Sequence, residues 1–162
     1  MLHVKYGKLI FKKDGILMIT LQRLQHHHLQ QCAALFMNVF NAAPWNDEWT
    51  EPVAQAYLQD FYDTPKQLSV VALDGDEIVG FLIGVQKKWW SGDEFFVHEL
   101  CVANDRQRQG IGKQLLNYLI EQLPTSVSNI TLLTDRGVPA EAFYKKNGFE
   151  EIERIVFLNK NL

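Results

Sequence analysis

Cysteine is scarce in this sequence: the 162 residues include only Cys32 and Cys101. Two cysteines cannot form the dense disulfide framework of small secreted domains. The first residues lack the long apolar run of a secretion signal. No stretch of the sequence approaches the ~18 consecutive apolar residues that a membrane-spanning helix needs. We therefore expect a cytoplasmic protein without a membrane partner.

An excess of positive charge is also missing. The net charge is −3, which gives no sign of a nucleic-acid partner. No metal site is predicted, because the consecutive histidines 26–28 would point in three directions on a helix. The composition, with 47% hydrophobic and 22% charged residues, is that of an ordinary globular protein. The length predicts a single domain over residues 1–162.

Turn signals and apolar periodicity predict the elements of this domain. A hairpin is expected over 8–12 and 16–20, with Asp14-Gly15 at its turn. Helices are expected over 22–42, 50–62, 110–122 and 139–146. Further strands are expected over 68–73, 77–86, 95–102, 129–134 and 150–158. Strands and helices alternate in the second half, so part of the sheet should be parallel.

The most informative segment is a glycine-containing turn between the strand at 95–102 and the helix at 110–122. It consists of Gln107, Arg108, Gln109, Gly110, Ile111, Gly112 and Lys113. Its glycines let the backbone approach a ligand, and the first turn of a helix offers unpaired N–H groups and a positive dipole end. Arg106, Arg108 and Lys113 add positive charge. The turn therefore predicts an anion site, most often for phosphate.

Two common phosphate loops do not fit this turn. A Walker A loop requires glycine at position 107 and Ser or Thr at position 114, and both positions hold glutamine. A dinucleotide fingerprint requires a third glycine at position 115, which is leucine. A nucleoside triphosphatase and a nicotinamide enzyme are therefore not expected.

Two segments together resemble the GCN5-related N-acetyltransferase (GNAT) family. The pattern Gln107-x-x-Gly110-x-Gly112 is similar to the family's pyrophosphate loop. Residues 140–149 are similar to its Ala-x-x-Phe/Leu-Tyr-x-Lys-x-Gly-Phe segment. The resemblance runs from about residue 68 to the end. It implies an α/β (α+β) fold with a mixed, mostly antiparallel sheet splayed at the fourth strand and helices on both faces. Many family members are dimers, so a homodimer is left open.

The resemblance also implies acetyl-CoA as co-substrate and a set of residues that bind it. The turn 107–113 would hold the pyrophosphate. Leu100 and Val102 would present backbone groups to the pantetheine arm on either side of Cys101, as an added strand does. The Cys101 N–H would polarise the thioester carbonyl. Many members carry asparagine where this sequence has Gly137, so the contact of that side chain is either lost here or made by Asp135 or Arg136.

Glu99 and Tyr144 are the predicted catalytic residues. Glu99 lies in an apolar strand, where desolvation would raise its pKa toward a value useful for a base. Strand alternation places the rival base, His98, on the opposite face. Tyr144, in the second motif, would protonate the leaving thiolate. Glu99 could instead be a structural carboxylate, or the amine could bind in its neutral form without a base. Cys101 is interpreted as a small buried hydrophobe, not a nucleophile.

The amine acceptor is predicted to bind at the loop between the first two helices. Trp45, Asp47, Glu48 and Trp49 would attract a cation through carboxylate charge and aromatic faces. Residues 89–94 contain a similar cluster of Trp89, Trp90, Asp93 and Glu94. The alternative is that these tryptophans are packing anchors beside solvated acids.

These features predict an N-acetyltransferase that transfers acetyl from acetyl-CoA to a primary amine of a small cationic molecule, by direct attack in a ternary complex. Acetylation of a protein lysine or N-terminus is one alternative. A non-catalytic acyl-CoA-binding module is another. A closed pocket under the two loop tryptophans would favour the small molecule, and an open groove would favour the protein.

Overall fold

The computed structural model describes residues 6–12 and 15–162, with side chains described from residue 18 onward. The strands are β1 (Tyr6–Lys12), β2 (Gly15–Arg23), β3 (Gln67–Asp74), β4 (Glu77–Lys87), β5 (Asp93–Val102) and β6 (Val127–Leu132). The helices are α1 (Leu29–Phe40), α2 (Glu51–Tyr62), α3 (Ile111–Gln122) and α4 (Pro139–Lys146). Short 3₁₀ turns lie at His26–His28 and Asn104–Arg106.

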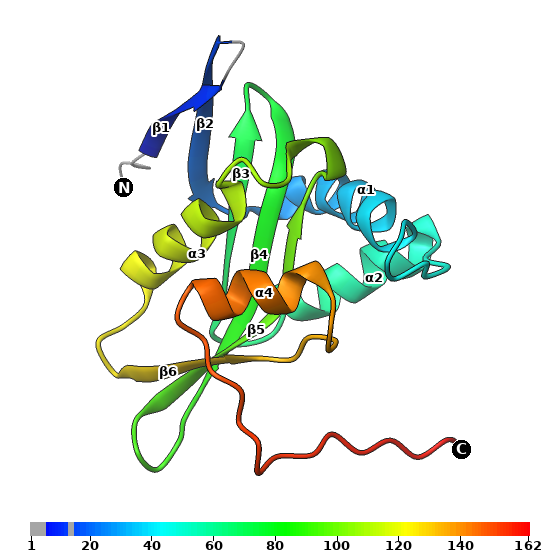
Figure 1. The fold of residues 1–162 in the computed structure, drawn as a ribbon, viewed down its shortest axis with the longest axis vertical. Helices are drawn as coiled ribbons and strands as arrows, with labels where there is room; N and C mark the ends of the chain where they lie inside the picture. The colour runs from blue at the N-terminus through cyan, green and yellow to red at the C-terminus, as the bar shows by residue number, and fades with distance from the viewer. Residues whose placement is uncertain (1–5, 13–14) are drawn as a thin grey trace.

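The six described strands form one sheet in the order β1-β2-β3-β4-β5-β6 (Figure 1). The pairs from β1 to β5 are antiparallel, and β5 pairs with β6 in parallel. The predicted mixed, mostly antiparallel sheet is therefore confirmed. The β5–β6 pairing ends at Val97 opposite Leu132. Beyond that point the two strands separate, which leaves one edge of residues 98–102 without a strand partner.

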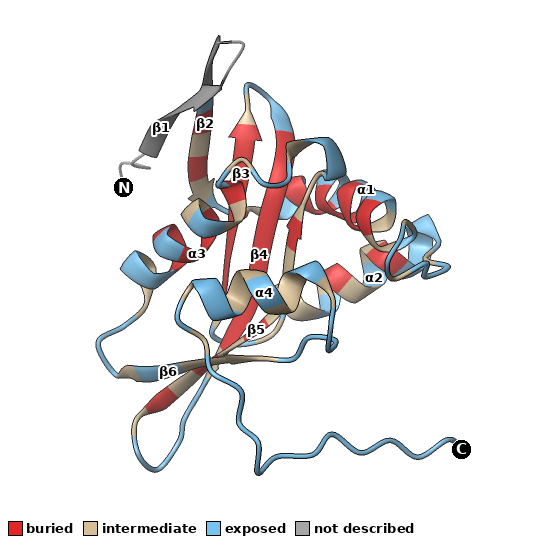
Figure 2. Cartoon of the chain, in the orientation of Figure 1, coloured by how far each residue is buried: buried red, intermediate tan, exposed pale blue. Residues whose placement is uncertain are grey.

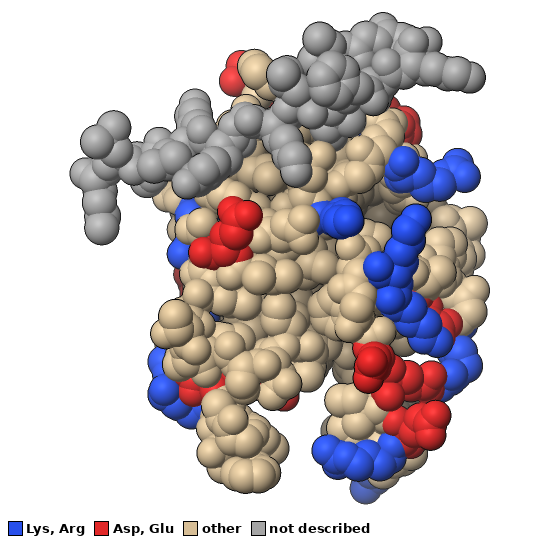
Figure 3. Space-filling model, turned by 60° about the vertical axis from the view of Figure 1, so that its left-hand side comes forward, with Lys and Arg blue, Asp and Glu red and all other residues tan. Residues whose placement is uncertain are grey.

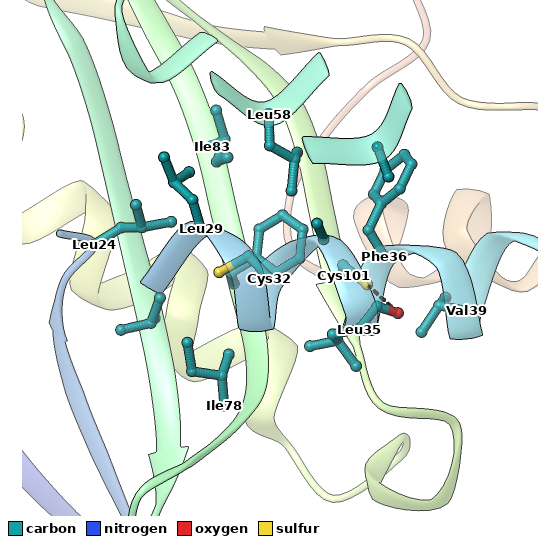
Figure 4. Close-up of a cluster of buried hydrophobic side chains, with 14 of the residues drawn as sticks. Leu24, Leu29, Cys32, Leu35, Phe36, Val39, Leu58, Ile78, Ile83 and Cys101 are labelled. Carbon is teal, nitrogen blue, oxygen red and sulfur yellow. Dashed lines mark hydrogen bonds between the residues drawn. The ribbon is translucent and has the colours of Figure 1, made fainter. Parts of the chain in front are cut away.

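Helices cover both faces of the sheet, as the sequence predicts. One core packs α1 and α2 against β3, β4 and β5, and includes Phe36, Leu58, Phe81 and Ile83 (Figure 4). The other packs α3 against the opposite face, with Leu115, Leu119 and Phe95 among its fully buried side chains. Figure 2 shows that burial concentrates on β3, β4 and the inward faces of the helices.

The helix predicted over 22–42 is wrong at its start. Residues 21–23 continue β2 and pair with Ala72, Val71 and Val70 of β3. A 3₁₀ turn follows, in which His28 is buried and its Nδ1 accepts the Gln25 N–H at 3.0 Å. The α-helix begins only at Leu29. Pairing with β3 therefore extends the strand to Arg23, into the residues expected to start the helix.

The strand predicted over 150–158 is also wrong. After α4, Gly148 takes a φ of 87° and the chain leaves the body of the protein (Figure 1). Residues 150–162 are exposed and form no strand. Its β-branched residues would stabilise a strand only by packing on a neighbouring strand, and among the described residues no strand adjoins this segment. The hairpin predicted near the N-terminus is confirmed by the β1–β2 pairing; its turn residue Asp14 lies outside the described residues.

Candidate active site

The predicted phosphate turn lies between β5 and α3, at the N-terminus of the helix. Gly110 caps α3 with a φ of 85°, a conformation that a residue with a Cβ rarely adopts. No atom lies within 4 Å of where a Cβ of Gly110 would stand, so the backbone there faces open space. The first N–H groups of α3 have no partner within the helix. An anion placed at this turn would meet these N–H groups and the positive end of the dipole.

Side chains of the turn divide into those that fix its shape and those that remain available. Gln107 Nε2 donates to the Val102 carbonyl at 3.2 Å, and Gln109 Nε2 donates to the Asp105 carbonyl at 2.9 Å. Arg106 is bound to Asp74 at 3.0 Å and does not add free charge. Arg108 and Lys113 are exposed, and within the described part of the chain neither has an ion pair. In Figure 3, Lys and Arg side chains lie on both sides of the view, with more of them on the right, where acidic side chains lie among them.

The unpaired edge of β5 exposes backbone groups next to the turn. The Ala103 N–H donates to the Val79 carbonyl of β4 at 3.0 Å. Because every second residue of an antiparallel strand bonds to the same neighbour, this bond fixes which residues of β5 direct their N–H and C=O groups toward β4. By this alternation the backbone groups of Leu100 and Val102 face the splay, whereas those of Cys101 face β4. The polarising role expected for the Cys101 N–H is therefore not supported. The backbone groups of Leu100 and Val102 lie on the open edge, and their contact with a pantetheine arm stays a prediction.

The Cys101 side chain lies in the α1–α2 core. It is 1% exposed, and its thiol lies 4.0 Å from the Leu35 carbonyl oxygen (Figure 4). Burial raises the pKa of this thiol well above its usual value, and the negative charge of Glu99 raises it further. A thiol held in its neutral form is a poor nucleophile. Its environment is that of the small buried hydrophobe expected from the sequence.

A β-bulge in β5 changes the positions of the two candidate bases. Ile83 lies opposite Glu99 and Gly84 lies opposite Val97, so His98 is the extra residue. The His98 ring stacks on Phe61 of α2 at 4.2 Å, and Glu99 accepts a hydrogen bond from Tyr57 of the same helix. The prediction that strand alternation separates His98 from Glu99 is therefore wrong. Both side chains face α2, because the bulge inserts one residue into the alternation.

Glu99 lies in a largely apolar environment that alters its protonation. Burial raises its pKa to about 7, with a smaller upward effect from Asp47, while the hydrogen bond from Tyr57 lowers it. The Tyr57 hydroxyl lies 2.6 Å from Oε1 of Glu99. A carboxyl that titrates near neutral pH is suited to accept a proton from an amine or a water molecule.

His98 has a different electrostatic environment. Burial lowers the pKa of its imidazole, and the positive charge of Lys87 lowers it further. Its ring contacts Phe61 and also Phe96, at a centroid distance of 4.8 Å. His98 is therefore a neutral ring in an aromatic contact at pH 7, next to the carboxylate in the chain.

Tyr144 projects from α4, packed edge-on against Phe143 and Phe149 at centroid distances of 5.2 and 5.5 Å. Burial raises the pKa of its hydroxyl, and the negative charge of Glu99 raises it further. The phenol is therefore fully protonated at neutral pH. The α4 helix also approaches the phosphate turn, because a Cβ on Gly112 would lie 3.3 Å from the Phe143 ring. These contacts place α4 against the start of α3, on the side of the splay.

The loop between α1 and α2 brings three of its four predicted acceptor residues together. Asp47, Glu48 and Trp49 line an open depression of about 410 Å³, together with Thr50 and Val53. Trp45 does not line it and packs on Phe40 at 5.0 Å. Trp49 packs on Phe36 and Tyr57, and its indole N–H donates to Asp47 at 3.0 Å. Trp45 thus fits the packing-anchor interpretation, whereas Trp49 both packs on aromatic neighbours and lines the depression; acceptor binding there stays a prediction.

The second tryptophan cluster does not form an acceptor site of this kind. Trp89 and Trp90 are exposed, but Asp93 is only 4% exposed and turns into the protein. Its carboxylate accepts from Ser126 at 2.8 Å and pairs with Lys88 at 3.0 Å, and these contacts lower its pKa. Asp93 therefore ties the β4–β5 hairpin to the start of β6.

Tyr57 is a candidate site residue that the sequence alone does not indicate. Its four-residue spacing from Phe61 on α2 indicates a helix face, but nothing in that spacing identifies Glu99 as its partner. The bulge had a sequence signal in Gly84, since an isolated glycine within a strand often marks one. Among the described residues, no group of three or more His, Cys, Asp or Glu could hold a metal ion. The described helices are also too short or too polar to cross a membrane.

Comparison with known proteins identifies the family. A family model described as the acetyltransferase (GNAT) family matches residues 32–149, and the chain belongs to this family. No curated protein sequence matches the chain significantly.

Solved structures share the fold at low sequence identity. A possible acetyltransferase from Clostridium difficile 630 gives a TM-score of 0.75 at 17% identity, covering 89% of this chain and 98% of that one. An aminoglycoside acetyltransferase from an uncultured soil metagenomic sample, in complex with sisomicin, gives 0.67 at 22%, covering 89% and 96%. The enzyme AAC(6')-Iy, with a bisubstrate analogue of CoA and acetylneamine, gives 0.70 at 16%, covering 89% and 99%.

Proposed function

We propose that this protein is an acetyl-CoA-dependent N-acetyltransferase that acetylates a primary amine of a small cationic molecule. The observation that carries the proposal is the Glu99 carboxyl, which lies beside the splayed edge of β5 with a pKa of about 7. A base at this position can take the proton that an ammonium group must lose before it attacks a thioester. Structural neighbours that are named aminoglycoside acetyltransferases add support for a small amine acceptor.

The residues of the splay fit the requirements of a CoA thioester. Gly110 and the start of α3 would bind the pyrophosphate with backbone N–H groups, and Arg108 and Lys113 would add charge. Backbone groups of Leu100 and Val102 would bind the pantetheine amides as an added strand does. The amine nitrogen would then form a bond to the thioester carbon, and the carbon–sulfur bond would break.

Two protons move in this reaction, and a named residue is available for each. Glu99 would accept the proton that the ammonium group loses before attack. Tyr144, kept protonated by its environment, would donate to the leaving thiolate. The second proton, which the nitrogen loses after the new bond forms, would restore the Tyr144 hydroxyl. A thiolate of CoA has a conjugate acid pKa near ~8.5, so a modest donor is sufficient. No covalent acetyl-enzyme is part of this proposal, since the Cys101 thiol is buried and neutral.

The acceptor would bind over the depression at Asp47, Glu48 and Trp49. Two carboxylates and an indole face favour a cation there. This depression is open and is not closed by Trp45. Its open shape favours a protein lysine or N-terminus, which is therefore the second candidate acceptor, whereas the charge and the aromatic face support the small cationic amine.

The test is acetyl-CoA turnover, measured as release of free thiol, across a panel of amines. The panel should hold monoamines, polyamines, aminoglycosides and a lysine-containing peptide. We expect turnover with cationic small amines and weaker turnover with the peptide. CoA binding without turnover on any amine would refute the enzyme proposal and favour a binding module. Preference for the peptide would favour the second acceptor.

A further inference from the structure

Tyr57 connects the acceptor side of the protein to the candidate base. It lies on α2, 42 residues before Glu99, and its hydroxyl donates to Glu99 Oε1 at 2.6 Å. Within the described residues, this is the hydrogen bond that the Glu99 carboxylate receives. One oxygen of the carboxylate is thereby held by a neutral donor, while the second is left for another proton or donor.

The position of the Tyr57 hydroxyl is fixed by packing of its ring. The ring lies 4.9 Å from Phe61, 5.0 Å from Trp49 and 5.6 Å from Phe36, measured between centroids. Trp49 is itself held in place, since its backbone N–H and carbonyl both bond to the Asn41 side chain at 2.9 Å. A tyrosine with three aromatic neighbours loses its freedom about both side-chain torsions. The hydroxyl is thus delivered to Glu99 by the same aromatic cluster that supports the acceptor loop.

We propose that Tyr57 is a positioning residue for the base: it holds Oε1 of Glu99, directs Oε2 toward the acceptor amine, and keeps the carboxylate ionised enough to accept a proton. This inference rests on the proposed acetyl transfer. It assigns no bond making or breaking to Tyr57, whose phenol stays protonated throughout because burial and the charge of Glu99 raise its pKa.

The other groups that face Glu99 act against ionisation or are neutral. Asp47, on the α1–α2 loop, disfavours the charged carboxylate, and so does burial. The negative charge of Glu99 raises the pKa values of Tyr144 of α4 and Cys101 of β5, so both groups are neutral. His98, the adjacent residue on β5, is also neutral at pH 7. Tyr57 is therefore the group that counteracts the effect of burial on the Glu99 pKa. Removal of its hydroxyl should change the titration of the Glu99 carboxyl.

The test compares Tyr57→Phe with the wild-type protein. Phenylalanine keeps the ring and its three aromatic contacts and removes only the hydroxyl. We expect the Glu99 pKa, followed by ¹³C NMR of the side-chain carboxyl and assigned with Glu99→Gln, to rise by about one unit, which corresponds to a tenfold change in the protonation equilibrium. Tyr62→Phe on the same helix is the matched control, because Tyr62 contacts His26 and not Glu99. It should leave this titration unchanged.

The kinetic arm uses any amine that the wild type accepts. The acid limb of kcat/KM should move upward by about one pH unit in Tyr57→Phe, with activity partly restored at alkaline pH. In a Glu99→Gln background the same substitution should have little further effect. An unchanged Glu99 titration, or equal losses in both backgrounds, would show that Tyr57 only packs. Absence of wild-type turnover would refute the acetyl-transfer proposal instead, while the NMR titration would still decide whether Tyr57 controls the charge of Glu99.

Discussion

Replacing Glu99 with glutamine should stabilise the protein at alkaline pH while it impairs the proposed reaction. The folded state raises the carboxyl pKa from 4.5 to about 7, mainly through burial. At 1.36 kcal/mol per pKa unit, holding this group ionised in the folded protein costs about 3 kcal/mol. Glutamine has nearly the same shape and can still accept the Tyr57 hydroxyl, so it removes the charge and little else.

The pH dependence of this effect has a defined sign. Between pH 4.5 and about 7 the folded state binds the Glu99 proton more tightly than the unfolded state does, so the stability of the wild type falls as the pH rises. The cost is absent below pH 4.5 and complete above about 7. The variant lacks this titration. Its stability advantage should be near zero at pH 4.5 and approach about 3 kcal/mol at pH 8.

Urea unfolding at pH 4.5, 6, 7 and 8, followed by tryptophan fluorescence, measures this difference directly. Glu121→Gln, at an exposed position of α3, serves as the control for loss of one negative charge from the whole protein. A stability difference between Glu99→Gln and wild type that stays constant over this pH range would refute the reasoning. It would show that Glu99 titrates alike in the folded and unfolded states.

Three further substitutions test other parts of the site. Gly110→Asp should abolish the thermal stabilisation that CoA confers on the protein. The control variant Gly110→Asn, with equal bulk and backbone strain but no charge, should weaken this stabilisation less. Equal CoA binding by the wild type and the Asp variant would exclude this turn as the pyrophosphate site. Tyr144→Phe should lower kcat about 10²-fold or more with little change in CoA affinity, and an unaltered kcat would leave Tyr144 a packing role. Asp47→Asn should raise KM for cationic amines. It should also move the acid limb of the kcat/KM profile to lower pH, opposite to Tyr57→Phe, because it removes a negative charge that raises the Glu99 pKa. A shift of the acid limb to higher pH would contradict this effect of Asp47 on Glu99.

Features that depend on short stretches of sequence could be predicted well. The phosphate turn follows from glycine spacing and from the apolar pattern of α3, and the structure places Gly110 at the helix cap with a positive φ. The helix at 139–146 agrees with the structure at both ends. These elements are specified by local propensity and turn chemistry, which a single sequence displays directly.

Features that depend on distant partners could not be predicted. Nothing near Tyr57 in the sequence indicates a hydrogen bond to a strand 42 residues away. The sequence predicts that residues 22–23 start a helix, but they join the sheet because β3 lies beside them. Residues 150–158 have strand-forming side chains but remain exposed. In each case the decision is made by a neighbouring element, which the composition of the segment does not reveal.

The bulge at His98 shows how a single inserted residue determines what the site can do. Phe95 and Val97, before the bulge, face α3, and the bulged residue His98 faces α2. After the bulge, Leu100 and Val102 again face α3, whereas Glu99 and Cys101 face the α1–α2 layer.

Strict alternation would have placed Glu99 on the α3 face, away from Tyr57 and the acceptor loop. Gly84 permits the bulge, since a Cβ there would lie 2.6 Å from the Phe96 carbonyl oxygen and 2.3 Å from the Phe95 ring. The same irregularity lies where the β5–β6 pairing ends. A local departure from regular pairing thus brings the candidate base to the open edge of the strand, where the acyl donor and the amine would meet.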